Sequence, residues 1–129
     1  MIFDSHAHYD DEAFNEDREA ILNSLPKNGI SPIVNVSAQL SGVTATVELT
    51  EKYPFIYGSV GVHPDHVGEL SEEKIQWMKE LAGREKIVAV GEIGLDHYWD
   101  TESDEVQRKW FIRQLELAKI GRASCRERV

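Results

Sequence analysis

Apolar and polar positions along the chain follow two alternating periods, which together predict four strand–helix units. Short runs of apolar and β-branched residues predict strands at 2–8, 32–37, 55–62 and 86–93. Apolar residues at three- and four-residue spacing predict amphipathic helices at 17–25, 40–52, 72–82 and 104–119. Nearly continuous apolar strands that alternate with such helices are typical of a parallel sheet covered by helices.

The regular length of these units narrows the fold class. Units of about thirty residues that begin on a strand fit a (β/α)8 barrel, which needs roughly 250 residues in all. The 129 residues of this sequence supply about half of that length. A small, complete doubly wound sheet of four strands is the alternative. The motifs described below favour the barrel, so we expect an α/β fold, an incomplete TIM (β/α)8 barrel of about four βα units.

The last segment, residues 120–129, differs in character from the rest. The helical period stops after Lys119, and small and basic residues follow, with three arginines against one glutamate. The segment can be encoded by a nucleotide string that resembles a common sequencing adapter. We therefore expect residues 1–119 to be the N-terminal half of a barrel, and residues 120–129 to be a non-native tail that truncates the reading frame. A genuine basic tail that contacts nucleic acid is the alternative.

Composition excludes several classes of protein. Hydrophobic residues make up 41% and charged residues 29% of the chain, which is ordinary for a globular domain. The formal net charge of −9 argues against a broad basic surface for binding nucleic acid. No apolar run is long enough to span a bilayer, so we expect no membrane partner. Cys125 is the only cysteine, which leaves no disulfide framework and favours a cytoplasmic location.

The segment Asp4-Ser5-His6-Ala7-His8 offers the first candidate chemistry. On a strand, residues two apart point to the same side, so His6 and His8 project together, with Asp4 one step behind. Two imidazoles on one rigid strand can bind a divalent transition metal. Two histidines at this spacing can also arise by chance, so the pair alone leaves both interpretations open.

Two further predicted strands end on residues of related chemistry. Gly61-Val62-His63-Pro64 ends the third strand with a histidine, and Gly91-Glu92-Ile93-Gly94-Leu95-Asp96 ends the fourth with a carboxylate. The carboxyl ends of parallel barrel strands share one face, where active sites are built. We therefore expect both segments at the rim that also holds the histidine pair, where a carboxylate can bridge two cations.

Together these three segments resemble the signatures of the TatD family of metal-dependent deoxyribonucleases, within the wider metal-dependent hydrolase barrels. Their order and separations are similar to the family's, and the resemblance extends over about residues 1–119. It implies that His6, His8 and Glu92 are metal ligands, with Glu92 shared between two metals. It implies that His63 is a catalytic residue beside the metals, near the substrate phosphate. It also implies one or two divalent ions (Mg, Mn or Zn) and a DNA substrate; we predict no protein partner.

The sequence departs from the family pattern after its fourth strand. The family has a His-x-Arg after a fifth strand, a histidine after a sixth and a late aspartate, and no residue here can take these places. We therefore expect the parent enzyme to cleave phosphodiester bonds and the chain as written to be inactive. Two alternatives stay open: a barrel that hydrolyses an amide, lactone or phosphomonoester of a small molecule, and a non-functional fragment that does nothing or associates.

Several other residues near these segments are expected to have supporting roles. Asp4 is expected to orient a histidine through its ring N–H rather than to bind metal. His66 and His97 are expected in loops. Helical spacing places Trp110 in the core, which leaves Trp99, in the loop after the fourth strand, as the tryptophan that could contact substrate by stacking.

Overall fold

All four predicted strand–helix units are present in the structure, a computed structural model that describes the backbone of residues 1–121 and 124–128 and the side chains of residues 1–120. Its strands are β1 Ile2–Ala7, β2 Ile30–Val36, β3 Ile56–Val60, β4 Ile87–Gly94 and β5 Ser124–Arg128. Its α-helices are α1 Arg18–Ser24, α2 Leu40–Lys52, α3 Glu72–Ala82 and α4 Asp104–Gly121. Three short 3-10 helices complete the described elements: η1 Glu12–Phe14, η2 Pro26–Asn28 and η3 Pro64–Glu69.

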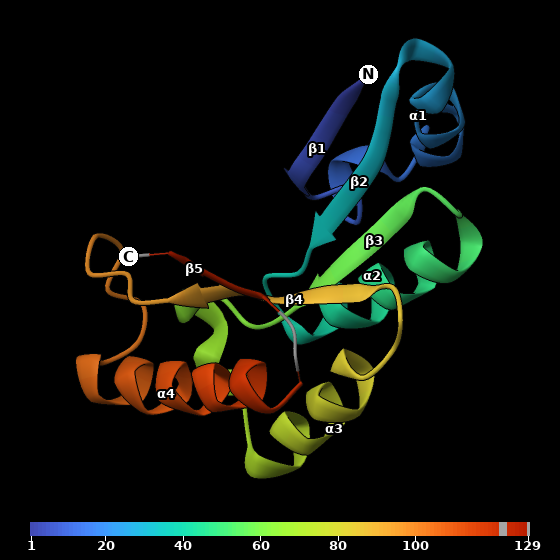
Figure 1. The fold of residues 1–129 in the computed structure, drawn as a ribbon. Coiled ribbons are helices and arrows are strands. Elements are labelled where there is room, and N and C mark those ends of the chain that lie inside the picture. The colour runs from blue at the N-terminus through green and yellow to red at the C-terminus, as the bar shows by residue number, and fades with distance from the viewer. Residues whose placement is uncertain (122–123, 129) are drawn as a thin grey trace.

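The strands form one parallel sheet in the order β1-β2-β3-β4-β5. Figure 1 shows this sheet curving from β1 to β5, with the four α-helices on its outer side. Each α-helix returns the chain to the start of the neighbouring strand, which is the repeating unit of a (β/α)8 barrel. The incomplete TIM barrel predicted from the sequence is therefore confirmed. A doubly wound sheet would need helices on both faces.

The fifth strand differs from the sequence-based expectation. Residues 124–128 pair in parallel with β4, although the sequence Ser-Cys-Arg-Glu-Arg lacks the apolar character of the other strands. The edge of a strand offers unpaired backbone donors and acceptors, which can accept an extended segment whatever its side chains. The assignment of residues 120–129 as a non-native tail stays a prediction, and residues 122, 123 and 129 lie outside the described part of the chain.

The core fills the space between the sheet and the helices. A larger cluster packs β3 and β4 against α2, α3 and α4; it includes the fully buried Met78 and, as its helical spacing predicts, Trp110. A smaller cluster packs β1 and β2 against α1 around Leu22. Phe3 of β1 and Val88 of β4 are strand residues that stay exposed. No helix in the described part of the chain has the length and apolar character needed to cross a membrane.

The ends of α3 illustrate how local sequence determines these elements. Ser71 is the N-cap, and its side chain accepts the backbone amide of Lys74 at 3.2 Å. Glu72 and Glu73 place negative charge in the first turn, where the helix dipole favours it. Gly83 is the C-cap residue that ends the helix.

The segment after β3 and the strand β4 approach each other closely where the two glycine motifs meet. An added Cβ at Gly61 would stand 2.7 Å from the carbonyl carbon of Gly91. A Cβ cannot come that close to another backbone, so only glycine fits at position 61. Because Gly91 immediately precedes Glu92, this approach also guides the backbone that leads into Glu92.

Replacing Gly61 by alanine should therefore destabilise the fold. The added methyl group must push two backbones apart, and overpacking of this kind typically costs about 1–3 kcal/mol. Urea unfolding followed by circular dichroism measures the change in the free energy of unfolding. Gly83→Ala is the control, because Gly83 has a φ of −76° and a Cβ there meets only the Glu80 carbonyl oxygen, at 3.3 Å. Equal stability of Gly61→Ala and the wild-type chain would contradict the close approach.

Candidate metal centre

His6 and His8 lie side by side at the carboxyl end of β1. His6 belongs to the strand, and His8 follows its last residue. Their Nε2 atoms are 3.2 Å apart, and their ring planes meet at 77°. The side chains are 40% and 42% exposed, so both can be reached from solvent. The two-residue spacing thus places both imidazoles on one side of the strand.

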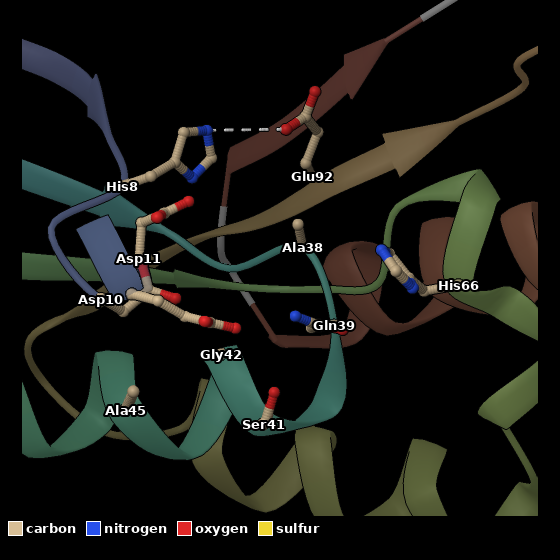
Figure 2. Close-up of a pocket in the computed structure, with 11 residues that line it drawn as sticks. His8, Asp10, Asp11, Ala38, Gln39, Ser41, Gly42, Ala45, His66 and Glu92 are labelled. Carbon is tan, nitrogen blue, oxygen red and sulfur yellow. Dashed lines mark ion pairs between the residues drawn. The ribbon is translucent and has the colours of Figure 1, made fainter. Parts of the chain in front are cut away.

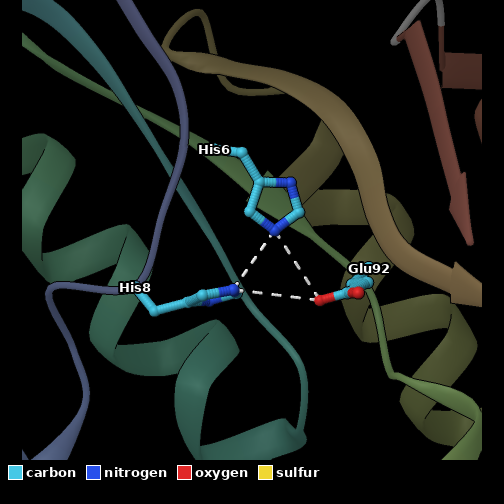
Figure 3. A group of neighbouring side chains, drawn as sticks. All are labelled: His6, His8 and Glu92. Atoms are coloured by element: carbon cyan, nitrogen blue, oxygen red, sulfur yellow. Dashed lines mark hydrogen bonds and ion pairs between the residues drawn. The ribbon is translucent and has the colours of Figure 1, made fainter.

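The third member of the group comes from β4. The Glu92 side chain is only 7% exposed, and its Oε2 lies 3.8 Å from His6 Nε2 and 3.9 Å from His8 Nε2. Figure 3 shows the three side chains pointing toward one another. The structure therefore brings together the three residues that the sequence analysis assigns to metal binding. Their role as ligands stays a prediction.

The separations of the donor atoms fit a divalent cation. The three potential ligand atoms all lie within 4.8 Å of one another. Around a cation with bonds of about 2.0–2.2 Å, neighbouring ligand atoms stand about 3.0–3.6 Å apart, close to the observed 3.2, 3.8 and 3.9 Å. His8 Nδ1 lies 2.7 Å from the Val36 carbonyl oxygen, to which it can only donate. The lone pair of the neutral His8 ring is therefore on Nε2, which faces the group.

The curvature of the sheet makes this contact possible. Neighbouring strands lie about 4.8 Å apart, so β1 and β4 would stand roughly 14 Å apart in a flat sheet. The Glu92 amide donates to the carbonyl oxygen of Ser37 at 2.7 Å. Ser37 follows β2, so this bond passes over the end of β3 and joins β4 directly to the end of β2. At the level of Glu92, the ends of β2 and β4 are therefore closer together than they would be in a flat sheet.

His63 lies outside that group, at the start of η3. Its side chain is 14% exposed, and its Nδ1 accepts the backbone amide of Asp65 at 3.0 Å. Asp65 Oδ2 lies 3.6 Å from the same nitrogen, which is too long for a hydrogen bond to a ring atom that already acts as an acceptor. In the neutral ring the hydrogen is therefore on Nε2. His63 also forms, with Asp65 and Asp96, a second group of potential ligand atoms within 4.8 Å.

An open cavity of about 580 Å³ lies beside the histidine pair. It is lined by His8, Asp10, Asp11, Glu12, Ala38, Gln39, Ser41, Gly42, Ala45, His66 and Glu92. Figure 2 shows His8 and Glu92 at one edge of this cavity, with the start of α2 on the opposite wall. The centre therefore opens onto a space through which a substrate can reach it.

His66, His97 and Trp99, which the sequence analysis expects in loops, lie in different places. The expectation is wrong for His66, which belongs to the 3-10 helix η3, because the chain after His63 turns at once into a short helix. His66 lines the cavity, so it belongs to the surroundings of the centre. His97 Nε2 lies 3.3 Å from Asp104 Oδ1, as a surface ion pair when the ring is protonated. Trp99 is 70% exposed and packs edge-on against Tyr98, with ring centroids 5.0 Å apart.

Two residues that support the centre were not identified from the sequence. Asn35 of β2 is fully buried; its Nδ2 donates to Asp10 Oδ1 at 3.0 Å, and its Oδ1 accepts the Tyr9 amide at 2.7 Å. Arg18 donates to the carbonyl oxygens of Tyr9 and Asp11, at 2.6 and 2.8 Å. Together they fix the segment that follows His8. Asn35 could have been identified because it is a polar residue within an apolar predicted strand, and a buried side-chain amide needs a hydrogen-bond partner.

Asp4 contacts the backbone of the strand that leads to the histidine pair, and its expected contact with a histidine ring stays a prediction. Its Oδ1 accepts the backbone amide of His6 at 3.2 Å. The ring of His8 is oriented by the main-chain carbonyl of Val36 instead of a carboxylate. The contact between Asp4 and the His6 amide steadies the strand backbone beneath the histidine pair.

Asp4 also affects the neighbouring tyrosine. Burial raises the pKa of the Tyr9 hydroxyl, and the negative charge of Asp4 raises it further.

Comparison with known proteins finds relatives that match most of the chain. A family model described as "TatD related DNase" matches residues 3–122. The uncharacterized metal-dependent hydrolase YabD of Bacillus subtilis is 38% identical, over 92% of this chain and 47% of its own length. The 3'-5' ssDNA/RNA exonuclease TatD of Dickeya dadantii is 27% identical, over 91% of this chain and 45% of its own length. The chain therefore spans about half the length of the curated relatives it matches.

A solved structure agrees with these matches. YjjV, a TatD homolog from Escherichia coli K12, superposes with a TM-score of 0.86 at 30% sequence identity, over 98% of this chain and 49% of that chain. The aligned half of YjjV thus has the same arrangement of strands and helices. Because the family model also matches nearly the whole chain, the protein belongs to the TatD family.

Proposed function

We propose that the protein is the N-terminal part of a metal-dependent hydrolase that cleaves phosphodiester bonds, with DNA as its substrate. The observation that supports this most directly is the group of His6, His8 and Glu92 at the carboxyl rim of the half-barrel. Family membership and the name of the exonuclease relative support nucleic acid as the substrate class. A polyanionic substrate also needs local positive charge in a protein of net charge −9, and bound cations supply it.

In this proposal the three side chains hold one or two divalent cations, Mg, Mn or Zn. The two Nε2 atoms and the Glu92 carboxylate are the ligands, and a carboxylate can bridge two ions through its two oxygens. When bound, a divalent cation polarises a phosphoryl oxygen and lowers the pKa of a bound water. The Val36 carbonyl keeps His8 in the tautomer that ligation through Nε2 requires.

His63 is the residue that contacts the substrate phosphate in this proposal. Because its Nδ1 accepts the Asp65 amide, its Nε2 has the hydrogen and can donate to a non-bridging phosphate oxygen. Negative charge on such an oxygen grows toward the transition state, where a fixed donor stabilises it most. Ligation through Nε2 would need the opposite tautomer, so the hydrogen bond with Asp65 supports a substrate contact over a metal contact.

We propose further that residues 1–119 are one half of a barrel whose other half completes the active site. The share of the relatives' length that the chain covers supports this division. A second half would supply the ligands and the carboxylate base that the family pattern places after the fourth strand. A cytoplasmic location remains part of the proposal, supported by a chain with one cysteine and no disulfide framework.

Removing a proposed ligand should prevent specific metal binding. We expect His6→Ala, His8→Ala and Glu92→Gln each to weaken the binding of Zn²⁺ or Mn²⁺ by the chain. Loss of a residue that only hydrogen-bonds a metal ligand costs roughly 10–100-fold in affinity, and loss of a ligand should cost more. Isothermal titration calorimetry measures this affinity. His97→Ala is the matched control, because its ring contacts Asp104 on the surface. Wild-type affinity in the His6→Ala chain would contradict the ligand assignment.

The half-barrel proposal predicts that residues 1–129 alone do not cleave DNA. A chimera that joins residues 1–119 to the C-terminal half of the Bacillus subtilis relative should cleave a single-stranded oligonucleotide when a divalent cation is added. Fragment analysis on denaturing gels detects the products. Metal-dependent cleavage by the unmodified chain would show that no second half is needed. A chimera that hydrolyses a small-molecule amide or lactone but no oligonucleotide would favour the alternative substrate class.

His63→Ala in the same chimera should reduce turnover without removing metal. Loss of one fixed donor to a developing oxyanion typically costs about 10²–10³-fold in kcat. Steady-state kinetics measures turnover, and the metal content of the dialysed protein measures occupancy. Loss of metal equal to that in His8→Ala would make His63 a ligand instead.

A further inference from the structure

Two buried serine hydroxyls lie next to the backbone that leads into Glu92. Ser37 follows β2 and Ser59 belongs to β3, and both are fully buried. Neither residue is part of the three signature segments. The contacts of their hydroxyls nevertheless all fall on Gly61 and Gly91, the glycines that precede the proposed substrate-binding and metal-binding residues.

Ser37 joins the ends of three strands. Its hydroxyl accepts the Gly61 amide at 2.9 Å, and its single hydrogen is directed to the Gly61 carbonyl at 2.9 Å in preference to the Gly91 carbonyl at 3.4 Å. Its own amide donates to the Ser59 carbonyl at 3.2 Å, and its carbonyl accepts the Glu92 amide at 2.7 Å. Every polar group of this residue therefore has a partner at the rim.

Ser59 completes the arrangement from the neighbouring strand. Its hydroxyl donates to the Gly91 carbonyl at 2.9 Å. The peptide group between Gly91 and Glu92 is thus held at both of its polar atoms: Ser59 binds its carbonyl oxygen, and the Ser37 carbonyl accepts its N–H. A peptide group fixed in this way cannot rotate without breaking a buried hydrogen bond, and an unpaired buried polar group costs about 1–3 kcal/mol.

The orientation of that peptide decides where the Glu92 side chain goes. Its carboxylate must cross the rim to stand 3.8 and 3.9 Å from the two histidine nitrogens. We propose that Ser37 and Ser59 are positioning residues for Glu92. The Ser59 hydroxyl and the Ser37 carbonyl hold the Gly91–Glu92 peptide, and the Ser37 hydroxyl holds the Gly61 backbone that packs against Gly91. Together these contacts keep the carboxylate within coordinating distance of the histidine pair. This inference rests on the proposed metal-binding function.

Small polar side chains are suited to this position. Gly61 and Gly91 approach so closely that no side chain fits between them, so a partner for their polar atoms must come from the side. A serine hydroxyl on the adjacent strand is short enough to reach and can both donate and accept. Alanine at either position would keep the packing but leave a Gly91 or Gly61 polar group without this partner.

Titration of the 1–129 chain with Co²⁺, followed by visible absorption, tests the proposal. The absorption of bound Co²⁺ depends on the ligand set and its geometry, so it reports on the position of Glu92. We expect Ser37→Ala and Ser59→Ala each to weaken Co²⁺ binding about 10–100-fold, as is typical for outer partners of a metal ligand, and to change the spectrum. Urea unfolding in EDTA gives the stability of each apo chain for comparison.

Thr50→Val is the matched control. It removes a hydroxyl that is also buried, but one that bonds the Val47 carbonyl within α2, at 2.7 Å. This variant should lose some stability and keep wild-type affinity for Co²⁺ and the wild-type spectrum. If it weakens binding as much as the serine variants do, the effect is a general loss of stability and the positioning role is overturned.

The remaining outcomes separate this inference from the proposed function. Wild-type affinity and spectrum in the serine variants would overturn the positioning role and leave the metal centre intact. If Ser37→Ala does not fold, Ser59→Ala, which removes one hydrogen bond, decides the question. A wild-type chain that binds no Co²⁺, either alone or joined to the C-terminal half of the Bacillus subtilis relative, would overturn both the metal centre and the role of the two serines.

Discussion

The contact between the end of β2 and Glu92 in β4 is the constraint on which the metal centre depends. The histidine pair lies at the carboxyl end of β1 and the carboxylate belongs to β4, and these strands are separated by two others. Side chains stand roughly perpendicular to a sheet, so those of distant strands meet only where the sheet curves strongly toward its inner side. The bond from the Glu92 amide to the Ser37 carbonyl marks this place, because it joins strands that are not neighbours.

Glycines allow the contact to form. Gly61 and Gly91 belong to two signature segments that are far apart in the sequence, yet a Cβ on the first would overlap the backbone of the second. The two signature segments therefore contain the glycines of one backbone contact, between Gly61 and Gly91, in addition to the proposed functional residues His63 and Glu92. A Cβ at Gly61 would push against the Gly91 backbone, which leads directly into Glu92, while His63 follows Gly61 by two residues.

Local sequence pattern was sufficient to predict the four strand–helix units. The family resemblance, and not the local pattern alone, selected His6, His8 and Glu92 as candidate ligands. The helix predicted at 40–52 has the same bounds as α2, because its amphipathic period and the proline after it act over short range. The alternation of side chains along a strand was enough to place His6 beside His8. The pairing of residues 124–128 with β4 was not predicted, because the segment lacks the apolar pattern by which the other strands were identified. Asn35 was missed for a different reason: its partners, Asp10 and Tyr9, are identified only once β1 and β2 are adjacent.

The end of β2 organises the centre although it contributes no proposed ligand. Asn35 holds the segment after His8, the Val36 carbonyl fixes the His8 ring, and Ser37 fixes the peptide before the Glu92 side chain. Three consecutive residues thus orient groups from β1 on one side and from β4 on the other. Two of these three contacts use main-chain carbonyl oxygens, which every residue type provides, so they leave no signature in the sequence. The proposed ligand segments supply the atoms that could bind a metal, and the end of β2 helps to hold those atoms at the distances that binding requires.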